Sequence, residues 1–189
     1  MTELKMWKKT GEPTKLAGKF GKWLISQMFV NPKTNKEEEF TLFGQKDWSI
    51  VLAITKERQV LVVRQYKQGC DSIVDELAAG TAGAESETPE TVMHRELREE
   101  TGFVADRVIP LGFVWIATRN SPTKAHLFLA LDCICVGEQD VDEGEEIEMR
   151  QVALAEWLRM VQDGRIMDPS SVTATMRALP FLGITLNGV

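Results

Sequence analysis

The stretch "GAESETPETVMHRELREETGF", residues 83–103, gathers glutamates around two arginines and then ends in a threonine and a glycine. Thr88, Pro89 and Glu90 supply a helix N-cap, a proline at the first helical position and an acid in the first turn. Gly102 suits the left-handed C-cap conformation that commonly ends a helix. The stretch therefore predicts one short helix between these two caps.

The spacing of the glutamates places three of them together on that helix. Glu96 and Glu100 are four residues apart and share a face, Glu99 lies beside both, and Arg95 can pair with Glu99 and leave the other two acids free. Two carboxylates about 4 Å apart repel by about 4 kcal/mol at an effective dielectric of about 20, so a cleft that holds them must protonate them or supply a cation. Oxygen-only clusters suit Mg²⁺ or Mn²⁺. The alternative is an exposed charged helix with intrahelical pairs.

The rest of the chain alternates strand and turn patterns before it closes with two helices. Strands are expected where β-branched and apolar residues recur between turn residues, at 23–30, 38–43, 48–55, 59–66, 72–78, 108–117, 125–136 and 147–152. Helices are expected in "LAEWLRMVQDG" and in "DPSSVTATMRAL", where Asp168 is the N-cap. Residues 1–45 read as an N-terminal hairpin arm that is too small to bury a core of its own, and residues 46–189 as the main domain.

Composition limits the classes of function. A hydrophobic content of 43% supports a packed core, and a net charge of -6 gives no basic surface for nucleic acid. Three cysteines without a C-x-x-C pair indicate reduced thiols and a cytoplasmic protein. The first residues carry no apolar signal region, and the best apolar run is broken by Asp132, so neither secretion nor membrane spanning is expected.

The helix and the loop before it resemble the Nudix box, G-x5-E-x7-R-E-U-x-E-E-x-G-U, in which U is apolar. The matching residues are Gly80, Glu87, Arg95, Glu96, Leu97, Glu99, Glu100, Gly102 and Phe103. Six residues, not five, separate Gly80 from Glu87, so the loop before the helix carries a one-residue insertion. The chain is therefore identified as a member of the Nudix hydrolase superfamily.

A second pair of motifs resembles the ADP-ribose and nucleoside diphosphate sugar pyrophosphatase branch of that superfamily. "VVRQYKQG" at 62–69 and "ELAAG" at 76–80 are similar to the V-R-Q-Y-R and E-L-P-A-G patterns of the branch. Lys67 replaces an arginine of the first pattern, and Ala78 replaces the proline of the second. The similarity runs from about residue 17 to about residue 180.

This resemblance implies a fold and an activity. The fold is an α/β class Nudix α/β/α sandwich with a mixed sheet, and the N-terminal β-hairpin arm is paired or exchanged across a homodimer. The activity is metal-dependent hydrolysis of the pyrophosphate bond of a nucleoside diphosphate sugar, ADP-ribose or a hexose nucleotide such as GDP-mannose, to a nucleoside monophosphate and a sugar phosphate. The alternatives are an 8-oxo-nucleoside triphosphatase, a coenzyme A pyrophosphatase, or a binding module that lost turnover.

The resemblance also implies the residues of the metal site. The metal, Mg²⁺ or Mn²⁺, is held by Glu96, Glu100 and the main-chain carbonyl of Ala79, and Glu145 of the acidic stretch 137–148 adds a ligand. The general base that activates water is Glu143, with Glu99 close by and Glu146 as a further alternative. A solvated run of charge is the other reading of the acidic stretch.

For the substrate, the resemblance implies contacts from four side chains. These are Arg64, Lys67, Glu76 and Arg119, the last of which falls about where the Ser-Pro-Gly type loop of the branch places its proline. Arg64 and Lys67 can equally be ordinary strand or interface charges. Trp48 and Trp115 are candidates for stacking on a base, although buried aromatic residues are more often part of a core.

Overall fold

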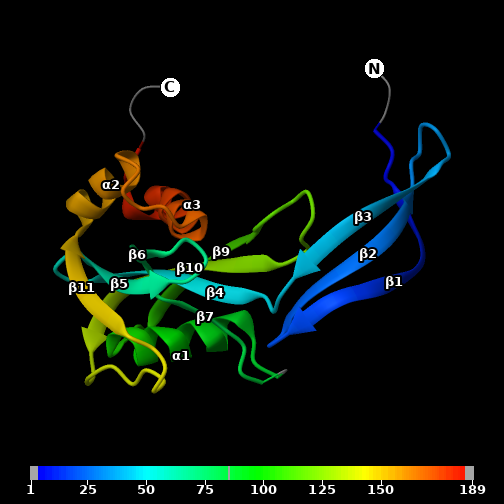
Figure 1. The fold of residues 1–189 in the computed structure, drawn as a ribbon. Coiled ribbons are helices and arrows are strands. Elements are labelled where there is room, and N and C mark those ends of the chain that lie inside the picture. Colours follow the sequence, from blue (N-terminus) through cyan, green and yellow to red (C-terminus); the bar gives the residue numbers. More distant parts are fainter. Residues whose placement is uncertain (1–3, 85, 186–189) are drawn as a thin grey trace. The chain divides into compact units, whose positions relative to one another are not determined.

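The structure is a computed structural model that describes residues 4–84 and 86–185. The contacts within the chain divide it into two compact units. The first unit comprises Met1–Lys46 and Trp115–Lys124, and the second unit comprises Asp47–Val114 and Ala125–Val189. Figure 1 labels the elements of both units.

The first unit is an antiparallel sheet of three strands in the order β1-β2-β3. The strands are β1 (Lys8–Lys19), β2 (Lys22–Val30) and β3 (Glu37–Gly44). The hairpin predicted at 23–30 and 38–43 is β2 and β3, and β1 is an additional strand that the sequence pattern did not reveal. Two register shifts interrupt its pairing with β2, and its glycines and proline hide the alternation by which strands are recognised.

The segment Trp115–Lys124 belongs to the first unit because it is bonded to the end of β3. The carbonyl of Asn120 accepts from the N–H of Phe43 at 3.0 Å. The hydroxyl of Thr123 accepts from the N–H of Gln45, also at 3.0 Å. This return of the chain to the first unit lies about 70 residues further along the sequence, beyond what a local pattern can show.

The second unit is built on a mixed sheet of eight strands. Its main path runs β11-β5-β4-β10-β8, in which β10 pairs with β4 in parallel and the other neighbours are antiparallel, while β6 pairs with β5, β7 with β4 and β9 with β10. The strands are β4 (Trp48–Thr55), β5 (Gln59–Lys67), β6 (Ser72–Leu77), β7 (Ala79–Thr81), β8 (Phe103–Val104), β9 (Arg107–Trp115), β10 (Lys124–Cys135) and β11 (Ile147–Ala153).

Helices cover both faces of this sheet, as Figure 1 shows. Helix α1 (Pro89–Thr101) lies on one face, and α2 (Leu154–Gln162) and α3 (Pro169–Ala178) lie on the other, with a 3₁₀ turn at Leu179–Leu182. The predicted α/β/α sandwich with a mixed sheet is therefore confirmed. None of the helices in the two described ranges is long and apolar enough to cross a lipid bilayer.

Successive side chains of a strand point to opposite faces of the sheet, so the same strands supply the apolar residues that pack against the helices on each face. On β4 and β5 the side chains that pack with α1 include Val51, Ala53, Leu61 and Val63, which form one buried cluster with Met93 and Leu97 of α1. The intervening residues point to the other face, where Trp157 of α2 is fully buried and donates a hydrogen bond to Thr175 of α3 at 2.9 Å. Both helix layers are thus fixed to a rigid sheet.

Candidate active site

The glutamates lie on a helix whose ends are fixed by the predicted caps. The Thr88 side chain accepts from the N–H of Thr91 at 3.2 Å, and Gly102 has φ 77°. Val92, Met93 and Leu97 are buried against the sheet, so this apolar face sets the orientation of the helix about its axis. In this orientation the Glu100 side chain also points into the protein.

Glu100 is a carboxylate inside the protein. It is 5% exposed, and its Oε2 atom accepts from the N–H of Ala79 at 2.8 Å. The pKa of Glu100 is raised to about 8, mainly by burial and in smaller part by the charges of Glu96 and Glu76, while the Ala79 N–H and Lys67 act in the opposite direction. A carboxyl group in such a place is protonated near neutral pH or requires a cation.

Glu96 is held against the backbone of β7. A Cβ atom placed on Gly80 would overlap the Glu96 carboxylate, so only glycine leaves room for it. Burial raises the pKa of Glu96, Arg95 opposes this, and the charges of Glu99 and Glu145 add to it. The motif therefore begins with a glycine because the Glu96 carboxylate occupies the space that a Cβ atom at position 80 would fill.

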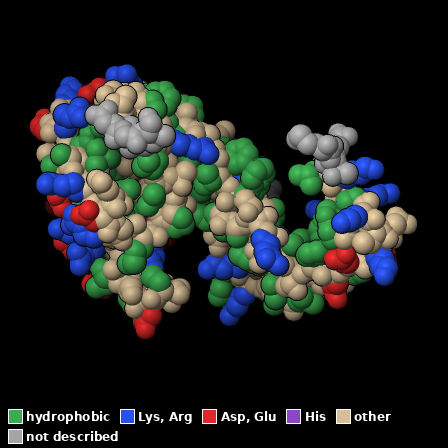
Figure 2. Space-filling view, turned by 90° about the horizontal axis from the view of Figure 1, so that it is seen from above, with side chains coloured by type: hydrophobic (Ala, Val, Ile, Leu, Met, Phe, Trp, Pro, Cys, Tyr) green, Lys and Arg blue, Asp and Glu red, His purple; other side chains and the backbone are tan. Residues whose placement is uncertain are grey.

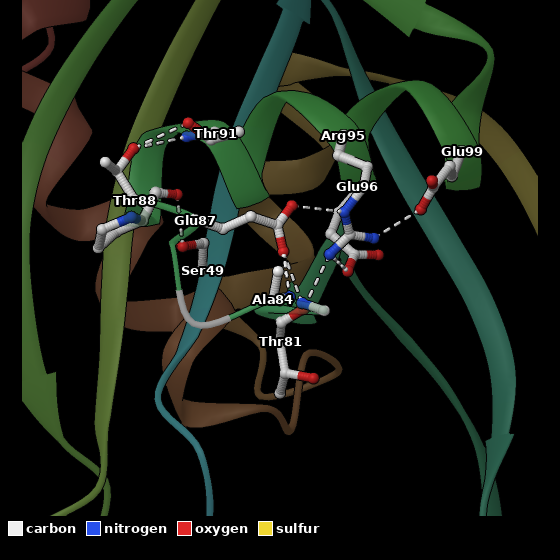
Figure 3. A network of polar contacts seen from close by, with 11 residues as sticks. Ser49, Thr81, Ala84, Glu87, Thr88, Thr91, Arg95, Glu96 and Glu99 are labelled. Carbon is white, nitrogen blue, oxygen red and sulfur yellow. Dashed lines mark hydrogen bonds and ion pairs between the residues drawn. The ribbon is translucent and has the colours of Figure 1, made fainter.

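Arg95 connects the acids to the loop before the helix, as Figure 3 shows. Its guanidinium contacts Glu87 at 3.2 Å, Glu96 at 2.8 Å and Glu99 at 2.7 Å. It also donates to the Thr81 carbonyl at 2.8 Å. The expected pair with Glu99 is present, but Glu96 is not left free, because the guanidinium has enough donors to reach both acids.

Glu87 organises the loop that carries the insertion. Its Oε2 atom accepts from the N–H groups of Gly83 at 2.6 Å and Ala84 at 3.1 Å, while its Oε1 atom accepts from Arg95 (Figure 3). These bonds lower the pKa of Glu87, the backbone bonds at Ala84 being the largest cause. Residue 85 lies outside the described residues. The insertion is thus accommodated next to an anchored glutamate.

The donor set fits a hard divalent cation in its chemistry. Glu96 and Glu100 offer carboxylate oxygens on neighbouring turns of α1. The charge of Glu96 raises the pKa of Glu100, and other nearby acids raise the pKa of Glu96. Within residues 4–84 and 86–185, no three His, Cys, Asp or Glu side chains converge on one point as ligands. Instead the acids take the Ala79 N–H and Arg95 as partners, as expected of carboxylates that repel each other.

The acidic stretch forms the loop from β10 to β11, and its beginning is bonded to α1. The Glu99 carbonyl accepts from the N–H of Asp140 at 2.8 Å, and the Glu100 carbonyl accepts from the side chain of Gln139 at 2.6 Å. Further along, Glu145 is exposed but close enough for its charge to raise the pKa of Glu96. Glu143 is exposed too, and no bond to α1 is found for it among the described residues.

Lys67 and Glu76 lie on the α1 side of the sheet, near Glu100. The ammonium group of Lys67 is 2.6 Å from the Glu76 carboxylate, which also accepts from Gln65 at 2.7 Å. Burial raises the pKa of Glu76, and Lys67 opposes this. Two of the four predicted substrate contacts are therefore a half-buried ion pair beside the glutamate helix.

The other two predicted substrate contacts lie elsewhere. Arg64 is three residues before Lys67, so it points to the opposite face of β5, where its guanidinium is 3.8 Å from Asp75. Arg119 is exposed in a turn of the first unit, outside the unit that carries the glutamates. Sequence proximity grouped Arg64 with Lys67, but the two-residue period of a strand separates them.

The two candidate tryptophans belong to different units. Trp48 is half-buried on β4, and its neighbour Ser49 points toward α1 and donates to the Pro89 carbonyl at 2.7 Å. Alternation places the Trp48 side chain on the other face of the sheet. Trp115 is exposed and belongs to the first unit.

Gln139 and Arg98 are the residues that the sequence interpretation missed. Gln139 joins the Glu100 carbonyl to the Ile147 carbonyl, at 2.6 and 3.4 Å, and Arg98 donates to the Glu138 carbonyl at 2.8 Å. Both tie the acidic loop to the helix. Their partners are main-chain atoms, which no side-chain motif records.

Comparison with known proteins identifies the family. Residues 45–169 match the NUDIX domain family. The chain is 29% identical over 125 residues to an ADP-ribose pyrophosphatase of Bacillus subtilis (strain 168), covering 66% of this chain and 67% of that protein. It is 30% identical over 129 residues to a methanol dehydrogenase activator of Bacillus methanolicus, with the same shares covered.

A solved structure described as an ADP compounds hydrolase superposes with a TM-score of 0.82 at 17% identity and covers 97% of both chains. This similarity shows that the two chains share a fold. The chain belongs to the NUDIX family and is a Nudix hydrolase.

Proposed function

We propose that this Nudix hydrolase cleaves the pyrophosphate bond of a nucleoside diphosphate sugar, ADP-ribose or a hexose nucleotide such as GDP-mannose. The products are a nucleoside monophosphate and a sugar phosphate. The observation that carries the proposal is Glu100, a buried carboxyl with a pKa of about 8 that lies beside a second acid. The similarity to an ADP-ribose pyrophosphatase supports this substrate class.

The residues that would hold Mg²⁺ or Mn²⁺ are Glu96, Glu100, Glu145 and the Ala79 carbonyl. When bound, such an ion supplies Lewis acidity toward phosphate oxygens and lowers the pKa of water. The cluster supports this because its acids are costly to charge without a cation, while a divalent cation would let Glu100 ionise at neutral pH.

The side chains around this cluster divide the remaining tasks. Arg95 holds Glu99 beside the cluster and keeps the loop at 81–87 in place. Glu143, on the acidic loop, accepts the proton of the attacking water. Lys67, which is paired with Glu76, supplies a positive charge toward the substrate phosphates. Arg64 and Arg119 are retained as substrate contacts, although Arg64 points to the face of β5 opposite to Lys67 and Arg119 belongs to the first unit.

A substrate panel with Mg²⁺ tests the proposal. ADP-ribose, GDP-mannose, UDP-glucose, NADH and nucleoside triphosphates should be separated by their kcat/KM, with the highest value for a nucleoside diphosphate sugar. Glu100→Gln and excess EDTA should each lower turnover by orders of magnitude. Glu90→Gln, which changes an exposed acid on the same helix, is the matched control and should retain activity. Full activity in EDTA would refute the metal requirement.

We also propose a homodimer that forms through the first unit. Three strands offer too little apolar area to close a core, and Phe40 and Phe43 of β3 remain more than a third exposed. Light scattering should give about twice the monomer mass of 21.2 kDa. A monomer at micromolar concentration would contradict this assembly.

A cytoplasmic location is the third part of the proposal. Cys70 and Cys135 are exposed, Cys133 is buried, and all three are free thiols. Free exposed thiols are typical of reducing compartments. A thiol titration of the freshly purified, denatured protein should find all three, and a disulfide would argue against this location.

A further inference from the structure

The turn between β1 and β2 carries a phenylalanine at a position where the backbone has a positive φ angle and the side chain is exposed to solvent. Phe20 and Gly21 are the two turn residues, with φ 53° and 73°, and the strand pairing closes at Lys19 and Lys22. Turns with two positive φ angles prefer Asn, Asp or Gly. Phe20 is nevertheless 86% exposed. A strained and solvated aromatic residue at a hairpin end is a feature that binding, not folding, explains.

Lysines surround this phenylalanine. Lys19 and Lys22 face each other across the turn, and the Lys19 ammonium is 4.6 Å from the centre of the Phe20 ring. The side chain of Lys46 comes close to Gly21. Leu16, which is 52% exposed, adds a second apolar group next to Lys15. We call these residues the β1–β2 tip: Lys15, Leu16, Lys19, Phe20, Gly21, Lys22 and Lys46.

The charge of the tip belongs to a wider asymmetry between the units. The first unit has eleven Lys and Arg against five Asp and Glu, a net charge of +6, whereas the second has eleven against twenty-three, a net charge of -12. Figure 2 shows Lys and Arg side chains, coloured alike in blue, at several places on the visible surface. The whole-chain charge of -6 conceals this basic unit.

Acids are absent from the part of the sequence that forms the tip. Residues 13–36 contain five lysines and neither Asp nor Glu. The acids that begin β3 pair with the opposite end of β2, where Glu37 accepts from Thr10 at 2.9 Å and Glu38 from Asn31 at 2.8 Å. The stretch that contains Lys15, Lys19 and Lys22 therefore carries no acid of its own to offset their charge.

We propose that the β1–β2 tip docks on a lipid bilayer that carries anionic headgroups. The lysines attract the headgroup phosphates, and Phe20 enters the boundary between headgroups and acyl chains, with Leu16 as a second exposed apolar side chain on β1. A nucleic acid fits less well, because a two-residue turn between strands about 4.8 Å apart offers no groove to follow a phosphate backbone. The inference concerns the first unit alone and does not depend on the proposed hydrolysis.

Sedimentation with vesicles tests this proposal on the full chain. The protein should sediment with vesicles of phosphatidylcholine containing one third phosphatidylserine at low salt, but not with phosphatidylcholine alone. Phe20→Asn suits the positive φ and so preserves the turn, yet it should weaken vesicle binding about tenfold. The double variant Lys19→Gln with Lys22→Gln should weaken it roughly 25-fold.

Matched controls separate the tip from charge in general. Lys33→Gln with Lys36→Gln removes the same charge from the turn at the other end of the sheet and should reduce binding far less. Hydrolase activity should be equal in all these variants. Failure to bind anionic vesicles, or equal binding by Phe20→Asn, would overturn the proposal. Binding of a single-stranded RNA oligonucleotide without vesicle binding would overturn it in favour of a nucleic-acid partner.

Discussion

Replacing Glu100 with Gln should make the metal-free protein more stable at alkaline pH even as it abolishes activity. The native carboxyl has a pKa of about 8 against an ordinary value of 4.5. Between these two values the native Glu100 holds a proton that the unfolded chain has released. Raising the pH therefore lowers the free energy of unfolding, and the stability is highest in acid. Glutamine is always neutral, so the variant loses this dependence.

The size of the effect follows from the same two values. Between pH 5 and pH 8 the wild-type protein should lose about 3.5 kcal/mol that the variant keeps, because each unit of pH across the window costs about 1.4 kcal/mol. In a protein of this size that corresponds to roughly 7 to 14 °C in Tm. The raised pKa values of Glu76 and Glu96 act in the same direction and remain in the variant. The measured quantity is therefore the difference between the two proteins.

Thermal unfolding followed by circular dichroism in EDTA, at pH 5, 6, 7 and 8, measures this difference. Glu90→Gln is the control, because it removes an exposed acid from the same helix and should run parallel to the wild type. Added Mg²⁺ should restore stability to the wild type at pH 8 and leave Glu100→Gln unchanged. Parallel curves for the wild type and Glu100→Gln would show that Glu100 is not a buried, protonated acid.

Two further substitutions test the site. Gly80→Ala should fold, because the Glu96 carboxylate can move away from a new Cβ, but its Mg²⁺ affinity, measured by calorimetry, should fall about 10-fold to 100-fold. Gly69→Ala is the control and should keep its Mg²⁺ affinity, because a Cβ at that position meets nothing within 4 Å. Glu143→Gln should lower kcat strongly and leave KM and Mg²⁺ affinity unchanged, because an amide cannot accept the proton of water. Glu145→Gln should instead weaken Mg²⁺ binding. If Glu143→Gln keeps a near-normal kcat from pH 6 to 9, the general base is Glu99 or Glu146.

The sequence predicted what depends on local chemistry. The caps at Thr88 and Gly102 and the apolar face of α1 are set by neighbours within one or two turns, so the helix and its glutamates could be located in advance. Strand positions followed from alternation in the same way. The buried state of Glu100 was not predictable, because it depends on β7 and on the β5–β6 pair that surround it.

What the sequence did not reveal depends on long-range pairing or on the face of a strand. The pairing of β1 was hidden by register shifts, and the association of 115–124 with β3 joins distant parts of the chain. Arg64 and Lys67 were grouped by a motif written as consecutive letters, although a strand turns them to opposite sides. The basic first unit was concealed for a similar reason, since a whole-chain charge averages two units of opposite sign.

The acidic loop is fastened to α1 at its beginning and free of that helix further on. Gln139, Asp140 and Glu138 are bonded to the end of α1, and Gly102 leaves room for the Gly137 carbonyl. Residues 141–146 lie beyond these bonds, and lengthening such a surface loop costs little free energy. This segment can therefore be exchanged for a loop of another length without moving the helix. In a laboratory evolution experiment, a library confined to 141–146 that keeps Glu143 and Glu145 should yield folded proteins at high frequency, and so the other positions of this loop are those at which specificity can diverge.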